Sequence, residues 1–232
     1  MKVFAISDLH LSINSNKPMN IFGPVWDNYL DKIEKHWQSI VSENDIVLIP
    51  GDISWAMKLN DAEADLNFIN KFKGKKVILR GNHDYWWSSI SALRNILPKE
   101  MYAIQNDAIK FENVIICGTR GWNLPNSKYF NSKDDEKIYN RELLRLELSL
   151  KHAKSLQKNG DIIIAMLHFP PFNNKLEDNE ITRLLEKYGV NKVVYGHLHN
   201  TDFIGKLVNV KNEITYYLTS CDLVGNVLTQ IV

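Results

Sequence analysis

Short runs of apolar, mostly β-branched residues recur along the chain, and polar loops follow them. Six such runs lie before residue 200, at residues 2–6, 45–49, 75–80, 114–118, 161–167 and 192–196. Unbroken apolar runs of this length are typical of strands that are buried on both faces of a sheet. The pattern therefore predicts strands with a layer of structure on either side.

Between these strands, apolar residues recur every three or four positions, which is the spacing of an amphipathic helix. One such stripe runs from Trp26 to Val41, and a second helix is expected from about Ile138 to Gln157, with Gly160 just beyond its end. Shorter helices are expected near residues 61–72, 88–96 and 177–188. Strand and helix in alternation indicate an α/β core.

The last forty or so residues have a different pattern and read as consecutive strands. These segments are 202–210, 213–220 and 226–232, with turns at Lys211-Asn212 and near Gly225. We expect an antiparallel sheet there, which makes the fold a layered α/β with one or two mixed sheets. The 232 residues contain no internal repeat and no low-complexity linker, so a single domain over residues 1–232 is predicted.

Charge and apolar content limit the partners that the chain is expected to have. The 28 basic and 27 acidic residues leave a formal charge of +1, so no overall field draws nucleic acid or anionic lipid to the protein. No apolar stretch approaches the roughly 18 residues of a membrane span, and the first residues do not read as a signal peptide. A cytoplasmic protein is expected, with Cys117 and Cys221 as buried thiols.

Residues that can bind a metal follow five of the predicted strands. They are, in chain order, Asp8, His10, Asp52, Asn82, His83, Asp84, His168, His197 and His199. In open α/β sheets, sites form outside the carboxyl ends of the strands, so residues far apart in the sequence converge there. A lone Asp after a strand is usually a turn or helix cap, but five strand ends with such residues favour a metal site.

The spacing and chemistry of these residues also favour metal binding. The Asp8-x-His10 and His197-x-His199 pairs would each place two ligands on one side of an extended segment, because alternate residues of a strand share a face. Carboxylate, imidazole and carboxamide ligands together favour manganese, iron(II) or zinc. Seven such side chains are too many for one open catalytic ion, and they suit two ions about 3.5 to 4 Å apart with one bridging carboxylate.

The ordered motifs DLH (8–10), GD (51–52), GNHD (81–84), His168 and GHLH (196–199) resemble those of the calcineurin-like metallophosphoesterase superfamily. The resemblance spans residues 8–199 and implies a two-layer β-sandwich of mixed sheets flanked by helices, with a dinuclear centre at one end. The ligands that it implies are Asp8, His10 and His199 for the first ion, Asn82, His168 and His197 for the second, and Asp52 between the two. It also matches His83 to the catalytic histidine of the family.

The mechanism that this centre predicts follows from charge. A water between two cations loses a proton near neutral pH, since one bound zinc ion already lowers the pKa of water to about 7. The hydroxide attacks phosphorus in line, while His83 protonates the leaving oxygen or stabilises its charge. We therefore expect a phosphohydrolase or phosphodiesterase that uses two divalent ions, manganese first, with iron and zinc as alternatives.

One departure from the superfamily pattern bears on the substrate. Its phosphoprotein phosphatases usually carry a second aspartate three residues after the bridging one and read GNHE, whereas this chain has Trp55 and Asp84 at those positions. The aspartate that supports their catalytic histidine is therefore missing. A dedicated Ser/Thr protein phosphatase is disfavoured, and the group that orients His83 stays open.

Residues near the motifs offer substrate contacts, each with a plainer alternative. Trp86 and Trp122 either stack on a nucleobase or pack under the active-site loops, and Arg120 either clamps a phosphate or forms a surface ion pair. The long polar segments 12–25 and 119–137 are candidate functional loops.

Three functions remain open. The favoured one acts on a small phosphoester or a nucleotide, with no membrane and no obligate protein partner expected. A DNA or RNA nuclease comes second, against which the near-neutral charge weighs. A non-catalytic scaffold of the same fold comes third, although the chain keeps every expected ligand and His83.

Overall fold

Two mixed β-sheets form the centre of the structure, a computed structural model that describes residues 1–15, 17–199 and 205–232. The first sheet has the strand order β11-β1-β2-β3-β4. Its strands are β1 (Val3–Ala5), β2 (Ile46–Pro50), β3 (Lys75–Leu79), β4 (Met101–Ala103) and β11 (Thr229–Gln230). All neighbours in this sheet are parallel except β11, which is antiparallel to β1.

The second sheet has the strand order β5-β6-β7-β8-β10-β9. Its strands are β5 (Ala108–Phe111), β6 (Val114–Thr119), β7 (Ile162–Leu167), β8 (Lys192–Tyr195), β9 (Val208–Lys211) and β10 (Ile214–Leu218). The four central strands are parallel, and the two edge strands are antiparallel to their neighbours. Both sheets are therefore mixed, as the sequence predicted.

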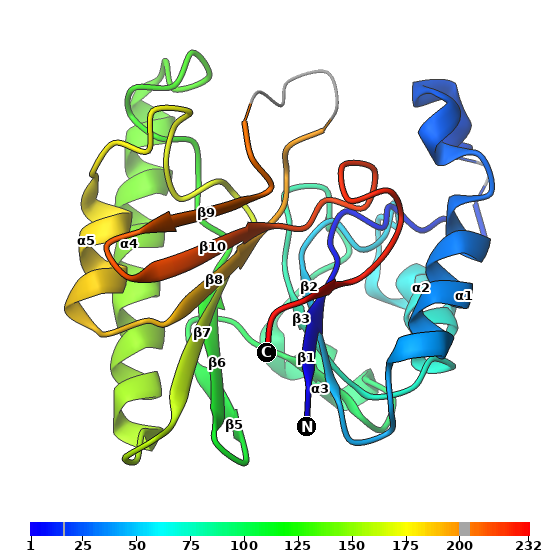
Figure 1. The fold of residues 1–232 in the computed structure, drawn as a ribbon. Helices are drawn as coiled ribbons and strands as arrows, with labels where there is room; N and C mark the ends of the chain where they lie inside the picture. The colour runs from blue at the N-terminus through cyan, green and yellow to red at the C-terminus, as the bar shows by residue number, and fades with distance from the viewer. Residues whose placement is uncertain (16, 200–204) are drawn as a thin grey trace.

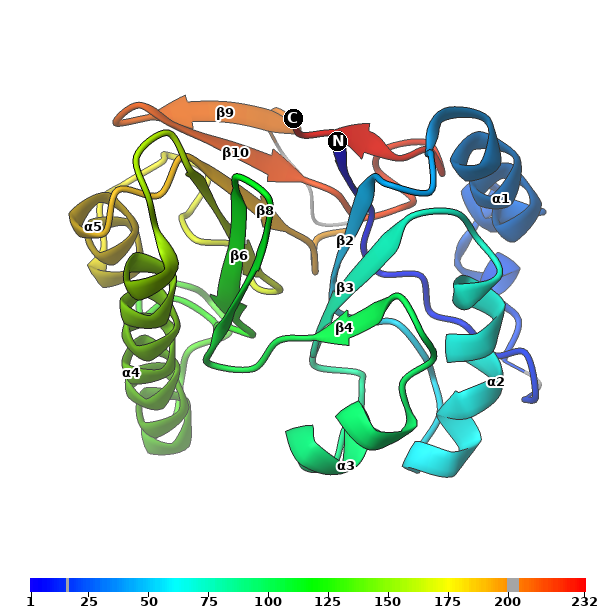
Figure 2. The same cartoon turned by 90° about the horizontal axis from the view of Figure 1, so that it is seen from below.

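Helices cover the outer face of each sheet (Figure 1). The helices α1 (Tyr29–Ile40), α2 (Leu59–Asn70) and α3 (Ile90–Ile96) lie on the first sheet, and α4 (Lys133–Leu156) and α5 (Glu180–Lys187) lie on the second. Figure 2 shows the two sheets between these groups of helices. Two 3-10 helices, η1 (Met19–Phe22) and η2 (Pro24–Trp26), precede α1.

The strands are buried on both faces because the core has three layers. In β1, Val3 and Ala5 lie between the two sheets, while Phe4 packs in the layer under α1 and α2. The same alternation places Leu48 between the sheets and Ile49 under the helices. The predicted two-layer sandwich flanked by helices is therefore confirmed.

The start of α4 and the C-terminal strands differ from the prediction. The helix begins at Lys133 rather than near Ile138, because Ser132 and Asp135 form a capping box that satisfies its first N–H groups. The expected antiparallel sheet is wrong beyond the β9–β10 hairpin, since β10 runs parallel to β8 and β11 joins β1 in the other sheet. Residues 202–204 of the predicted strand 202–210 lie outside the described residues.

Two further features concern the cysteines and the helices. Cys117 and Cys221 are both buried, unpaired thiols, as predicted. Within the described parts of the chain, none of the helices has the length and apolar character needed to cross a membrane.

Candidate metal centre

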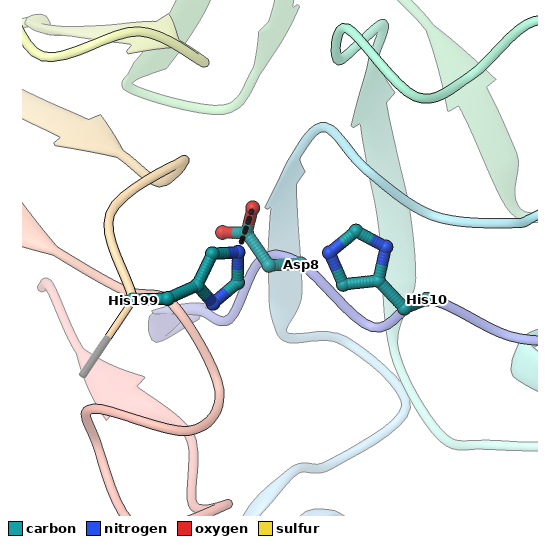
Figure 3. A group of neighbouring side chains, drawn as sticks. All are labelled: Asp8, His10 and His199. Atoms are coloured by element: carbon teal, nitrogen blue, oxygen red, sulfur yellow. Dashed lines mark ion pairs between the residues drawn. The ribbon is translucent and has the colours of Figure 1, made fainter. Parts of the chain in front are cut away.

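The loops after β1, β2, β3, β7 and β8 carry the predicted ligands, and the structure brings their side chains together. One group consists of Asp8, His10 and His199 (Figure 3), and a second consists of Asp8, Asp52 and His168. In each group, one ligand atom from every residue lies within 4.8 Å of the others. Asp8 belongs to both groups, so the two form one continuous cluster.

Asn82 and His197 complete this cluster. The Oδ1 atom of Asn82 lies 2.6 Å from Nε2 of His168 and 2.9 Å from Nδ1 of His197. The other ring nitrogen of His168, Nδ1, lies 3.0 Å from the carbonyl oxygen of Pro50. A proton on Nδ1 would be held by this carbonyl, which leaves Nε2 free to bind a cation.

The backbone around these ligands is not extended, so the predicted extended geometry of the Asp-x-His and His-x-His pairs is wrong. Asp8, His10, Asp52 and His197 have φ values of 58°, 47°, 52° and 72°, a left-handed region that residues other than glycine rarely adopt. The N–H group of Asp8 donates to the carbonyl oxygen of Gly51 at 3.0 Å, which holds one of these tight turns. Such strained backbone is typical of functional sites.

Gly81 and Gly196 have no side chain, and the space beside them is occupied by the carboxylates of Asp52 and Asp8. A Cβ atom on Gly81 would overlap Oδ1 of Asp52, and a Cβ atom on Gly196 would overlap Oδ2 of Asp8. Any side chain at these positions would therefore displace a carboxylate of the cluster.

The surroundings of His10 indicate that the cluster suits a cation. The Nδ1 atom of His10 is buried and has no hydrogen-bond partner among the described residues. Its Nε2 atom lies 3.9 Å from Oδ2 of Asp52, which is too far for a hydrogen bond. A buried imidazole without partners is costly, and a cation held by Nε2 would give that nitrogen a partner. The carboxylate, imidazole and carboxamide atoms around it suit a hard or borderline divalent ion.

Protonation in the cluster follows from burial and from close charges. Burial lowers the pKa of His10 and of His197 to about 3, so both rings are neutral at pH 7, the form that binds metals. Burial also lowers the pKa of His168, but the charge of Asp52, the hydrogen bond with Asp52, the charge of Asp8 and the carbonyl of Pro50 together outweigh burial and bring the pKa to about 9. Burial raises the pKa of Asp52, yet His168 holds it well below its usual range. His168 must therefore lose a proton when a cation binds. Burial lowers the pKa of His199 as well, but the hydrogen bond with Asp222 and the charges of Asp8 and Asp222 outweigh burial, so this pKa is also raised.

Asp84 joins the loop after β2 to the loop after β3. Its carboxylate accepts five hydrogen bonds of 2.7 to 3.2 Å, and the donors are the backbone N–H groups of Gly81, Asp52, Ile53 and Ser54 and the indole of Trp86. Burial and the charge of Asp52 raise the pKa of Asp84 to about 6, against the effect of these hydrogen bonds. Asp84, the residue after His83, thus links the two loops that carry Asp52 and Asn82.

We expect Asp84→Asn to lower the free energy of unfolding by about 1 to 3 kcal/mol, because a carboxamide NH₂ would face backbone N–H donors and leave at least one of them unsatisfied. Urea unfolding at pH 7 measures the difference. Glu63→Gln on the exposed face of α2 is the matched control and should change stability by no more than about 0.5 kcal/mol. Equal stability of the two variants would show that the carboxylate does not hold the loops together.

Trp55 lies where the phosphoprotein phosphatases have an aspartate, and it packs against two imidazoles. Its ring stacks on that of His10 with centroids 4.8 Å apart and an interplanar angle of 22°. The ring of His83 lies 4.9 Å from the Trp55 ring. The backbone N–H of His83 donates to Oδ1 of Asp52 at 2.8 Å. At the position of the missing aspartate, an indole therefore packs against the ring of His83. The backbone of His83 is held separately by its hydrogen bond to Asp52.

Ser220 and Asp222, which the sequence interpretation missed, form hydrogen bonds to the proposed ligands Asp8 and His199. Oδ1 of Asp222 lies 3.1 Å from Nδ1 of His199, and the hydroxyl of Ser220 donates to Oδ2 of Asp8 at 2.9 Å. Contacts of this kind fix the orientation of metal ligands. The signal was present, because Ser220 and Asp222 come at the end of the predicted strand 213–220, as the other ligands follow theirs.

A cavity of about 350 Å³ opens beside His10, His83 and His199. Its other lining residues are Met19, Phe22, Val25, Trp26, Trp55 and Asp222. Several of them belong to the predicted functional loop 12–25. A ligand held here would therefore contact both imidazoles and aromatic or apolar groups.

The three predicted substrate residues lie in different places. Trp86 is only 1% exposed and donates its indole N–H to Asp84, so it has no face open to a ligand. The indole N–H of Trp122 donates to Asp135 at 2.9 Å, and its ring borders a cavity of about 570 Å³ that reaches His197. Arg120 lies outside both of these cavities, with its guanidinium 4.7 Å above the Trp122 ring and 4.0 Å from Glu142.

The sequence matches a protein family whose properties agree with this fold and with this cluster. The family model of calcineurin-like phosphoesterases matches residues 1–201, so the chain belongs to that family. The family is metal-dependent. A relative from Coxiella burnetii, described as a probable cyclic nucleotide phosphodiesterase, is 23% identical over 217 residues, which are 86% of this chain and 76% of the relative.

Solved structures show the same fold at low sequence identity. The protein TT1561 of Thermus thermophilus superposes with a TM-score of 0.60 at 13% identity, covering 99% of this chain and 97% of that one. Phosphopantetheinyl hydrolase (PptH) from Mycobacterium tuberculosis superposes with a TM-score of 0.58, also at 13% identity, covering 100% and 95%. At such identities these likenesses show the architecture alone.

Proposed function

We propose that the chain is a phosphoesterase with a dinuclear metal centre that hydrolyses a small phosphoester. The observation that supports the proposal is that seven side chains able to bind a metal converge from five loops. The two groups around Asp8 and the contacts of Asn82 define this set. The membership of the chain in the calcineurin-like phosphoesterase family supports the same reaction class.

The proposed ligands divide between two ions. Asp8, His10 and His199 would hold one, and Asn82, His168 and His197 the other, with Asp52 shared. When bound, two divalent ions, manganese in our proposal, would acidify a water and neutralise charge on the phosphoryl group. Asp52 suits the shared position because Oδ2 lies 3.9 Å from Nε2 of His10 and 3.5 Å from Nε2 of His168.

His83 would act on the leaving group. Its ring lines the cavity of about 350 Å³, while its backbone N–H rather than its side chain contacts Asp52. From this cavity the ring would give a proton to the oxygen that leaves phosphorus, as a general acid.

The cavity favours a substrate with a planar, apolar group. Trp26 and Trp55 both line it, and a base that stacks on an aromatic side chain gains about 1 to 3 kcal/mol. The description of the Coxiella burnetii relative as a probable cyclic nucleotide phosphodiesterase points the same way. We therefore favour a nucleotide ester, and a diester before a monoester.

A chromogenic panel with manganese tests this proposal. It contains p-nitrophenyl phosphate, bis(p-nitrophenyl) phosphate and p-nitrophenyl esters of nucleotides. A cyclic nucleotide is tested beside them, and its hydrolysis is monitored by chromatography. We expect hydrolysis that a chelator abolishes and added manganese restores, with faster turnover of the nucleotide ester than of the simple diester. Metal binding without hydrolysis of any compound would instead support a non-catalytic scaffold.

A further inference from the structure

A separate cavity of about 250 Å³ is rich in arginine. Arg80 reaches it from the end of β3, Arg120 from the end of β6, and Arg141 and Arg145 from α4. In the lining that the structure describes, Glu142 is the only acidic residue. We call this cavity the arginine pocket.

The single carboxylate of the arginine pocket is already engaged. Oε1 of Glu142 accepts a hydrogen bond of 2.7 Å from Arg145 and lies 4.0 Å from Arg120, and Oε2 accepts one of 2.6 Å from the hydroxyl of Thr119. Four guanidinium charges therefore face one carboxylate, so the pocket keeps an excess of positive charge.

Two donors of the pocket have no acceptor among the described residues. The Nε atoms of Arg80 and Arg120 are buried, and neither has a hydrogen-bond partner among the described residues. Burial lowers the pKa of Arg120, Glu142 raises it, and the charges of Arg80, Arg141 and Arg145 lower it further. The guanidinium groups are thus close enough to repel one another, and buried donors without acceptors are costly.

We propose that the arginine pocket binds a phosphate-type oxyanion. A tetrahedral dianion would offset the excess charge and would accept hydrogen bonds from the unpartnered N–H groups. Guanidinium groups suit this role because their planar fork matches phosphate oxygens and stays charged at every physiological pH. The amide side chains of Gln105 and Asn106, which also line the pocket, add neutral donors.

The arginine pocket adjoins the loops of the metal cluster but is distinct from the cavity beside His83. The two linings share no residue. Arg80 comes two residues before Asn82 in the chain. The carbonyl oxygen of Arg120 accepts hydrogen bonds of 3.0 Å from the N–H groups of His168 and Phe169. The anion would therefore contact Arg80, near Asn82, and Arg120, whose backbone holds His168, without entering the proposed catalytic cavity.

Tungstate, a heavy analogue of phosphate, locates the site in crystals of the manganese-loaded full chain. We expect an anomalous peak within hydrogen-bond distance of Arg80 and Arg120, in addition to any peak at the metal cluster. Arg141→Gln removes an exposed guanidinium that no described residue binds, so folding should be preserved while the pocket peak is lost. Lys137→Gln, which removes one charge from the same helix outside the pocket, should keep the peak.

Calorimetry on the same proteins identifies the source of the oxyanion. Inorganic phosphate and adenosine 5′-monophosphate are titrated separately. Binding of the first alone identifies free phosphate, and binding of the second alone identifies a phosphate group on a larger molecule. In either case, Arg141→Gln should weaken the pocket affinity at least about tenfold, as the loss of a charged hydrogen-bond donor predicts. Tungstate at the metal cluster alone, or equal affinities in Arg141→Gln and Lys137→Gln, would overturn the proposal whatever the outcome for catalysis.

Discussion

Asp52→Asn is expected to abolish metal binding and, with it, hydrolysis. Asp52 is buried at 1% exposure beside His10 and His168, and its carboxylate supplies the negative charge that the shared position needs. An amide offers one oxygen and no charge, so metal affinity should fall by more than the roughly 10- to 100-fold that loss of a mere supporting contact costs. Metal content per chain after dialysis, measured by mass spectrometry, gives the result.

The matched control for this change is Asp134→Asn. Asp134 lies on the first turn of α4 with a largely exposed side chain, so the same chemical change there should leave metal content as in the unaltered chain. If Asp52→Asn kept two ions per chain, the role of Asp52 as the shared ligand would be excluded.

His83→Ala is expected to keep the metal ions while turnover falls about 10²- to 10⁴-fold, the usual contribution of a general acid. Alanine retains the backbone N–H that donates to Oδ1 of Asp52 at 2.8 Å, so the contact that this position makes with a metal ligand survives. Only the ring that lines the cavity is lost. Turnover and metal content are measured on the same preparation, with the nucleotide ester as substrate.

His152→Ala provides the matching loss of an imidazole. His152 is exposed on α4, and its ring accepts a hydrogen bond of 3.0 Å from the backbone N–H of Ala108, which is not a proposed ligand. Its variant should therefore keep both metal and turnover. Metal loss in His83→Ala as severe as in Asp52→Asn would remove the division between a ligand and a proton donor.

The identity of the proposed ligands was readable from the sequence because each comes just after a buried strand. Short apolar runs fix the strands, and parallel neighbours bring their carboxyl ends to one edge of each sheet. Asp52 and His168 follow strands of different sheets, so they meet because the two sheets pack together. The runs predicted only a layered α/β fold, and the sandwich was implied by the resemblance to the calcineurin-like superfamily. The structure agrees with both, since residues of the runs alternate between two packed faces.

The backbone of the ligands and the last strands were not readable in this way. Left-handed conformations at Asp8 and His10 depend on hydrogen bonds to the loop after β2, and no local pattern encodes such contacts. The pairing of β11 with β1 joins the two ends of the chain, so periodicity within either segment carries no information about it. The support of His199 by Asp222 depends on the same long-range packing.

The substrate residues show a further limit of sequence patterns. Aromatic residues beside a motif suggest a binding platform, but Trp86 lies in the core, whereas Trp55 lines the cavity beside His83. Which aromatic residues face a cavity depends on how the loops fold back on the sheets. Arg120 likewise lies near Glu142 and lines the arginine pocket instead of the cavity beside His83. Its role therefore has to be inferred from these surroundings and not from the motif in which it occurs.

Anomalous diffraction from crystals grown with manganese tests the dinuclear centre itself. Two peaks about 3.5 to 4 Å apart are expected, with a carboxylate oxygen of Asp52 within bonding distance of both, one peak beside His10 and His199 and the other beside His168 and Asn82. A single peak, or two peaks that do not share Asp52, would contradict the proposed centre.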